Sequence, residues 1–253
     1  MLKLADKKVL ITGYTGIVGS VLVEGLKEEF DLRGISRHPE EQEGIEVFQA
    51  DVADKESLYE PFTDVDVIIH LAANPSIFGE WDSVLNNNIE GTYNVFEVAR
   101  EKNVKRIIFA SSNHVTGIYT KQRKRMNTDM PVAPDSLYGV SKVFGEALGR
   151  YFAEYYDISV ISLRIGWICE EDDPGSYRVE EMKEELLRMW LSHRDFVDMV
   201  RKCCNAEPDV KHHIFYCMSE NTGSLWDQTD AKTVVGYNPQ DDSAEYDEEI
   251  WFQ

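Results

Sequence analysis

The chain has 253 residues, of which 43% are hydrophobic and 28% charged, a composition typical of a globular protein with a sizeable core. Its formal net charge of −20 at pH 7 argues against nucleic acid and anionic membranes as partners, because both would repel the chain. The four cysteines have no CxxC spacing and no histidines at ligand intervals. We therefore expect reduced thiols, no metal site and a cytoplasmic location.

Short apolar segments alternate with longer amphipathic ones along the first two thirds of the chain, a pattern typical of βαβ units. In chain order, strands are expected at 8–12, 32–36, 45–49, 65–71, 106–110 and 159–163. Helices are expected at 16–29, 55–60, 81–102 and 137–156. We predict an α/β fold with a doubly wound parallel sheet, the Rossmann fold. Residues 1–164 would form its dinucleotide-binding core, and 165–253 a small substrate-binding cap of the same globular unit.

A GxxGxxG motif, formed by Gly13, Gly16 and Gly19, lies between the first expected strand and the first expected helix. Glycines at this spacing permit a tight turn, let backbone N–H groups approach a pyrophosphate and allow close packing of helix on strand. The positive end of the helix dipole, near Ile17, adds attraction for phosphate. The motif therefore predicts a site for NAD or NADP.

The end of the second strand indicates which of the two cofactors binds. An acidic residue normally binds the adenosine ribose of NAD there, but Ser36 stands in its place. Arg37 could pair with the 2′-phosphate of NADP or be a solvated loop cation. Asp51 could accept a hydrogen bond from the adenine or cap the next helix, and Val52 is assigned to the same surface. This end of the site slightly favours NADP.

A tyrosine and a lysine, Tyr138 and Lys142, are spaced to share one face of the expected helix. A nearby ammonium stabilises a phenolate and lowers the tyrosine pKa from its usual value of about 10, so Tyr138 could act as a base. Ser112 and Asn113 directly follow the fifth strand, at the sheet edge where such folds bind ligands. They could hold a substrate oxygen as charge develops on it, or simply form a turn.

Two further motifs, His70-Leu71-Ala72-Ala73 and Asn87-Asn88-Ile89-Glu90-Gly91-Thr92, accompany the glycine loop and the catalytic pair. Together these features resemble the extended short-chain dehydrogenase/reductase family, the NAD-dependent epimerases and dehydratases, over essentially the whole chain. The resemblance implies that Ser112 polarises the substrate oxygen, Tyr138 exchanges its proton and Lys142 binds the nicotinamide ribose. It also implies that Asn88 holds a water of the proton relay and that Leu71, Ala72 and Ala73 pass beneath the cofactor.

A narrower resemblance, to uronate dehydrogenases and archaeal NAD-dependent glucose-6-phosphate dehydrogenases of that family, rests on the segments 81–85, 109–114, 134–142, 190–192 and 236–241. Both groups oxidise the anomeric carbon of a free or phosphorylated sugar to a lactone. The resemblance therefore implies an NAD(P)-dependent oxidoreductase acting on C1 of an aldose or uronic acid, with Tyr138 as the base. The sequence departs from these relatives at Ser36, where they carry an acidic residue. It also departs from uronate dehydrogenases at Trp167, where they have a serine.

The residues expected to contact the sugar are Ser76, Ser112, Asn113, Trp167 and Arg178. Ser76 lies in a loop with the length, but not the residues, of the glucose-6-phosphate enzymes. Arg178, or a cation of the basic run 121–125, could meet a sugar carboxylate or phosphate, although charge runs are usually solvated surface.

Other functions stay open at this point. A sugar epimerase or dehydratase would retain its NAD(P) without net change in it. A non-catalytic NAD(P)-sensing protein would typically lose the tyrosine or the lysine, and both are present. The expected helices 81–102 and 137–156 could pair with those of a second copy, as is common in the family, to form a homo-oligomer.

Overall fold

The computed structural model describes residues 7–176 and 180–246. Its centre is one sheet of parallel strands in the order β3-β2-β1-β4-β5-β6-β7. The strands are β1 (Lys8–Thr12), β2 (Asp31–Ser36), β3 (Ile45–Gln49), β4 (Val67–His70), β5 (Arg106–Ser112), β6 (Ser159–Ile165) and β7 (His212–Cys217). The predicted doubly wound Rossmann fold is confirmed.

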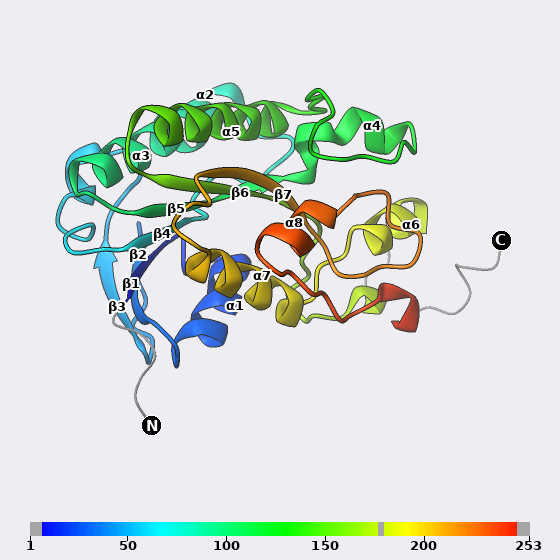
Figure 1. Cartoon of the computed structure of the whole chain (residues 1–253), viewed down its shortest axis with the longest axis horizontal. Coiled ribbons are helices and arrows are strands. Elements are labelled where there is room, and N and C mark those ends of the chain that lie inside the picture. The colour runs from blue at the N-terminus through cyan, green and yellow to red at the C-terminus, as the bar shows by residue number, and fades with distance from the viewer. Residues whose placement is uncertain (1–6, 177–179, 247–253) are drawn as a thin grey trace.

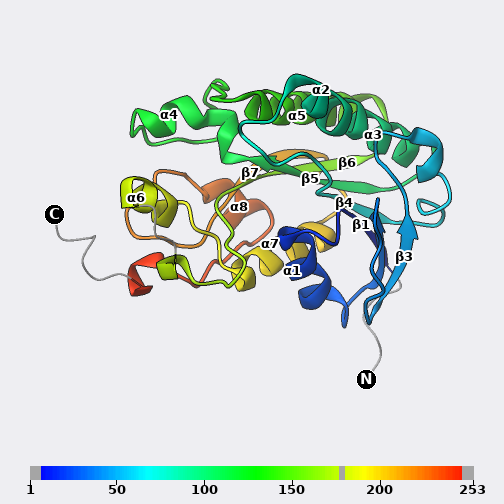
Figure 2. The same cartoon turned by 180° about the vertical axis from the view of Figure 1, so that it is seen from behind.

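Helices cover both faces of this sheet (Figure 1). One layer contains α2 (Trp81–Val84), α3 (Gly91–Glu101) and α5 (Leu137–Tyr155), with the short α4 (Gly117–Lys121) at its end. The other layer contains α1 (Ile17–Leu26) and α7 (His193–Asn205), which lie side by side (Figure 2), and α8 (Thr229–Val234). The remaining helix, α6 (Glu180–Arg188), lies at the end of the molecule away from β3.

The core follows from this layering, because a parallel sheet covered on both faces buries most residues of its central strands, whereas the edge strand β3 stays partly exposed. All four residues of β4 are buried, as its apolar sequence predicts. One hydrophobic cluster lies on the α1 and α7 side and includes Leu22 and Phe196. Another lies on the α3 and α5 side, where the Phe96 and Phe152 rings pack edge to face at 5.4 Å. Each such buried side chain contributes about 1.5–3 kcal/mol to stability.

The segment predicted as one helix, 81–102, is interrupted in the structure. Between α2 and α3 the residues Leu85–Glu90 form a π-helical turn. Such turns insert an extra residue into a helix and often occur at functional sites. Here the turn carries Asn88, which is buried. The short helix expected at 55–60 is a single 3₁₀ turn, Lys55–Leu58, with Asp54 as its N-cap.

The sheet also extends beyond residue 164, where the sequence analysis ends the core. β6 continues to Ile165, and β7, which the sequence pattern did not reveal, pairs in parallel with β6. Some residues of this part of the chain, among them Met189, Tyr216 and Trp226, form a smaller hydrophobic cluster together with Met126. Arg178 lies outside the described residues. Among the described residues, no helix has the length and apolarity needed to cross a membrane.

Candidate active site

The phosphate loop lies where the strand order reverses, between β1 and β4, which is the position where open α/β sheets bind ligands. Gly13 has φ +73°, a left-handed conformation that favours glycine, and its N–H bonds the Ile35 carbonyl at 2.9 Å. Gly16 is the N-cap of α1. A Cβ on Gly19 would overlap the Gly13 carbonyl, so α1 can approach the loop only with glycine there.

A cavity of about 460 Å³ opens on this loop. Every residue predicted for the phosphate and adenosine end of the cofactor lines it: Gly13, Gly16, Ile17, Gly19, Ser36, Arg37, Asp51, Val52, Leu71, Ala72 and Ala73. The floor is held by the buried Thr12 hydroxyl, which accepts hydrogen bonds from the amides of Leu71 and Ala72 at 3.1 and 3.0 Å. The structure therefore assembles one site from the ends of β1, β2, β3 and β4.

At the adenosine end, Ser36 is engaged within its own turn. Its hydroxyl lies 3.2 Å from both the amide nitrogen and the carbonyl oxygen of His38, and 3.2 Å from the Thr15 hydroxyl. Arg37 is exposed and borders the cavity, so its side chain can reach a 2′-phosphate from solvent. Asp51 accepts a hydrogen bond from the Ala53 amide at 3.0 Å while also lining the cavity. The adenine contact considered for Asp51 is compatible with this position, whereas the N-cap of the following turn is Asp54 and not Asp51.

A second cavity of about 340 Å³ continues from the first, since Val18, Leu71, Ala73, Pro75 and Ile168 line both. Ser112 at the end of β5 and Tyr138 and Lys142 on α5 line it together. Asn113 and Trp167 also line this cavity. The long α5 begins at the N-cap Ser136, whose hydroxyl accepts from the Gly139 amide, so Tyr138 occupies its first turn.

The electrostatics of Tyr138 and Lys142 differ from the expectation. Lys142 is 4% exposed, and burial lowers its pKa to about 7. Its Nζ lies 5.4 Å from the centre of the Tyr138 ring. Burial raises the pKa of Tyr138, and a hydrogen bond with Ser112 partly lowers it. The predicted lowering by Lys142 is therefore not found, because desolvation disfavours the charged forms of both groups.

Replacing Lys142 with methionine should remove activity yet stabilise the cofactor-free protein by a few kcal/mol near pH 7. Above the unfolded lysine pKa of 10.5 neither state is charged, so burial costs nothing. The cost grows as pH falls from 10.5 to about 7 and is constant below that pH. Denaturant unfolding at several pH values measures it, with the exposed Lys211→Met as the matched control. A Lys142→Met protein that is less stable than wild type at pH 7 contradicts the prediction.

Behind the predicted catalytic residues lies a buried ion pair that sequence reasoning missed. Arg164 on β6 donates two hydrogen bonds of 2.9 Å to Glu146 on α5, and both side chains are almost fully buried. Glu146 also accepts a hydrogen bond of 2.6 Å from Ser111, the residue before Ser112. Arg164 lies three residues before Trp167, but no local pattern indicated that its partner is Glu146, four residues beyond Lys142. Glu146 on α5 thus holds β6 through Arg164 and the end of β5 through Ser111.

Another polar pair touches Tyr138, the predicted base. His114 Nδ1 lies 2.9 Å from Asp135, and the His114 ring packs edge to face on Tyr138 at 5.9 Å. Asp135 also pairs with Lys121 at 3.5 Å, while Arg123 of the basic run pairs with Glu184. These two basic side chains thus have carboxylate partners on the surface.

Two predicted residues have surroundings that the sequence did not show. Asn88 is 2% exposed. Its amide nitrogen donates to the Asn74 carbonyl and to Ser141, both at 3.0 Å, and its oxygen accepts from the Asn74 amide at 2.7 Å. One lone pair of that oxygen is left for a water. Ser76 is exposed and accepts from the Phe78 amide within its own loop, so it does not line the cavity, whereas its neighbour Pro75 does.

The sequence analysis also missed apolar residues of the catalytic cavity. Leu186 and Met189 form part of its wall, together with Ile165 and Ile168. Asn113 donates a hydrogen bond to the Met189 sulfur, which ties the end of β5 to the segment after α6. No motif marks these positions, because any apolar side chain of similar size could fill them.

Comparison with known proteins decides the family. A model described as the NAD dependent epimerase/dehydratase family matches residues 9–176, more than half of the chain. The chain belongs to the NAD-dependent epimerase/dehydratase family. Within it, the chain is similar to an NAD-dependent glucose-6-phosphate dehydrogenase of Haloferax volcanii, 37% identical over 95% of this chain and 96% of that protein. An L-arabinose 1-dehydrogenase (NAD(P)(+)) of the same organism is 36% identical over 94% and 98%, respectively.

Solved structures of the epimerase/dehydratase family agree with this assignment. Uronate dehydrogenase from Agrobacterium tumefaciens superposes with a TM-score of 0.85 at 32% identity, covering 96% of this chain and 88% of that one. A mutant of that enzyme was solved complexed with NAD. The predicted resemblance to uronate and glucose-6-phosphate dehydrogenases of the family is therefore confirmed.

Proposed function

We propose that this protein oxidises C1 of an aldose or uronic acid, free or phosphorylated, to the lactone, with NAD⁺ or NADP⁺ as hydride acceptor. The observation that carries the proposal is the meeting of Ser112, Tyr138 and Lys142 in a cavity continuous with the glycine-loop cavity. The relatives support it, since they are named as dehydrogenases of glucose 6-phosphate, L-arabinose and uronate. The protein is thus an NAD(P)-dependent oxidoreductase.

The residues present divide the chemistry between them. A nicotinamide ring, when bound, supplies the acceptor for the hydride that leaves C1. The Ser112 hydroxyl hydrogen-bonds the anomeric oxygen, and Tyr138, as the phenolate, takes the proton from that hydroxyl. Lys142, once charged, stabilises the phenolate and binds the ribose. The sugar loses one proton and one hydride and becomes the lactone. Asn88 holds a relay water through the free lone pair of its amide oxygen.

On the sugar side, Asn113 and Trp167 line the cavity and Ser112 holds the reacting oxygen. An indole presents a flat apolar face, which suits the C–H face of a sugar ring. We propose that Arg178 meets the carboxylate or phosphate of a charged sugar. The unpaired thiols of the four cysteines support a cytoplasmic location.

A panel of sugars tests the function. Purified protein is mixed with glucose, galactose, L-arabinose, glucuronate, galacturonate or glucose 6-phosphate and with each cofactor, and reduced cofactor is measured by absorbance. Net reduction with at least one sugar supports C1 oxidation. Conversion of one of these sugars without net reduction of the cofactor would instead identify an epimerase. Cofactor binding without turnover of any sugar would identify an NAD(P) sensor.

We propose that NADP is accepted at least as well as NAD, because Ser36 removes the carboxylate that would repel a 2′-phosphate. Ser36→Asp should shift the ratio of kcat/KM toward NAD by about ten- to a hundredfold, the value of a charged hydrogen bond of about 1.5–3 kcal/mol. Arg37→Ala should weaken NADP alone. A wild type that strongly prefers NAD, with the ratio unchanged in Ser36→Asp, would show that this strand end does not read the ribose.

The outer face of α3 and α5 is the surface we propose for a second copy of the chain. Tyr93, Val140, Tyr151 and Tyr155 are all exposed there, and the rings of Tyr151 and Tyr155 lie 4.9 Å apart. Aromatic side chains are enriched at protein interfaces, and two helices presented in this way suit a two-fold contact. The molar mass from light scattering distinguishes a monomer from a dimer or larger assembly.

A further inference from the structure

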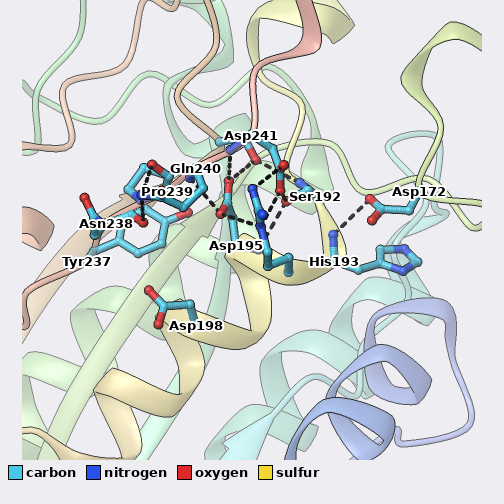
Figure 3. Close-up of polar contacts among 12 residues, drawn as sticks. Asp172, Ser192, His193, Asp195, Asp198, Tyr237, Asn238, Pro239, Gln240 and Asp241 are labelled. Atoms are coloured by element: carbon cyan, nitrogen blue, oxygen red, sulfur yellow. Dashed lines mark hydrogen bonds and ion pairs between the residues drawn. The ribbon is translucent and has the colours of Figure 1, made fainter. Parts of the chain in front are cut away.

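The C-terminal turn 236–241 is held against the start of α7 by a buried carboxylate (Figure 3). Asp195 is 1% exposed, and its oxygens accept hydrogen bonds from the amides of Gln240 at 2.9 Å and Asp241 at 3.1 Å. The same carboxylate accepts a hydrogen bond of 2.7 Å from the Ser219 hydroxyl. A buried charge is tolerated only when it is hydrogen-bonded in this way, so these contacts hold the turn firmly.

A second set of contacts closes the same junction. Ser192 is the N-cap of α7, since its hydroxyl accepts from the Asp195 amide at 3.1 Å. That hydroxyl donates to the Asp241 carboxylate at 2.6 Å, and the exposed Arg194 also pairs with Asp241. The segments 190–192 and 236–241 are far apart in sequence, but these contacts and those of Asp195 join them into one structural unit. We call this unit, Asp195 included, the α7 clamp.

From the α7 clamp, hydrogen bonds lead to the wall of the catalytic cavity. Ser219 accepts from the Ser192 amide at 3.0 Å, and its own amide donates to the Trp190 carbonyl at 2.9 Å. The neighbouring Leu191 amide donates to the Trp167 carbonyl, and the Trp167 amide donates to the Met189 carbonyl, both at 2.8 Å. Trp167 and Met189 line the cavity that also holds Tyr138.

We propose that Asp195 is a positioning residue for sugar recognition. By holding the turn 236–241 and Ser219 in place, it sets the backbone from which Trp167 and Met189 form the cavity wall. The inference rests on the proposed function, because that cavity is where the sugar would bind. Of the segment next to Trp167, Ile168 also lines the cofactor cavity, whose other lining residues come from 13–19, 35–37, 50–52, 71–75 and Asn87. We therefore expect the α7 clamp to act mainly on the sugar and only weakly on the cofactor.

Asp195→Asn tests this role with almost no change in shape. The asparagine side chain has one acceptor oxygen where aspartate has two. One of the backbone N–H groups of Gln240 and Asp241 therefore loses its acceptor and faces the NH₂ group of the asparagine. The KM for the preferred sugar should rise about tenfold, and kcat should stay within about threefold. The ratio of kcat/KM between the preferred sugar and the next best should fall several-fold. The dissociation constant of the cofactor, measured by calorimetry, should stay within about twofold.

The matched control is Asp242→Asn. It makes the same exchange at Asp242, the residue after the turn 236–241, whose carboxylate binds Thr222 and the Ala244 amide at the surface. This variant should keep the wild-type KM and sugar ratio. If Asp195→Asn fails to fold, Ser219→Ala removes the hydroxyl that joins Asp195 to Ser192 and should change KM and the sugar ratio in the same direction.

The outcomes separate the two hypotheses. A wild type that oxidises no aldose or uronate overturns the proposed function and, with it, this inference. An active wild type whose variants lose only thermal stability, with KM and sugar ratio unchanged, overturns the positioning role and leaves the function intact. An equal loss of cofactor and sugar affinity would likewise overturn it, because it would indicate general loosening of the fold.

Discussion

Tyr138→Phe should abolish turnover while leaving the cofactor dissociation constant within a few-fold of wild type. The substitution removes the only hydroxyl of this side chain, which is the group that takes the anomeric proton. The ring is kept, and with it the packing on His114 and the position beside Lys142. Steady-state kinetics with the preferred sugar, together with calorimetric titration of the cofactor, measure the two effects separately.

Retention of more than about a tenth of wild-type kcat exceeds what the loss of an essential base allows, and would remove Tyr138 from that role. Tyr155→Phe, on an exposed tyrosine of the same helix, is the matched control and should leave kcat unchanged. A loss of cofactor binding in Tyr138→Phe would point to a disturbed cavity and would leave the base unidentified.

Arg164→Leu should destabilise the protein by about 3–5 kcal/mol, because it leaves the Glu146 carboxylate buried without its partner. Urea unfolding followed by circular dichroism measures the free energy of unfolding. Arg201→Leu is the matched control, since Arg201 pairs with Glu29 at the surface and such pairs contribute about 1 kcal/mol or less. Similar losses in the two variants would show that burial does not govern the strength of the Glu146–Arg164 pair.

The double variant Glu146→Leu/Arg164→Leu separates charge from packing. Removing both charges avoids the uncompensated carboxylate, so the double variant should be more stable than Arg164→Leu alone. It should still lower kcat, because Ser111 loses its acceptor and Ser112 loses the support of its neighbour. Full activity in the double variant would show that the pair is not needed to place Ser112.

The sequence by itself determined the features that depend on local spacing. The glycine loop is recognisable from its spacing because its glycines meet local steric requirements: Gly13 has a positive φ, and a Cβ on Gly19 would overlap the Gly13 carbonyl. Tyr138 and Lys142 are recognisable because helical periodicity alone brings them to one face. The strands β1 to β6 follow from apolar runs that a covered parallel sheet requires. These inferences need no knowledge of which segments meet in space.

Only the tertiary structure decided what depends on contacts between distant segments. β7 is recognised as a strand only by its pairing with β6. The π-helical turn at Asn88 is likewise a tertiary feature, since Asn88 is held there by hydrogen bonds with Asn74 and Ser141. The pKa directions of Tyr138 and Lys142 were set by burial, which no residue spacing reveals. The Glu146–Arg164 pair and the α7 clamp likewise join residues far apart in sequence. Desolvation and long-range hydrogen bonding arise from the packed chain, and therefore they cannot be read from local patterns.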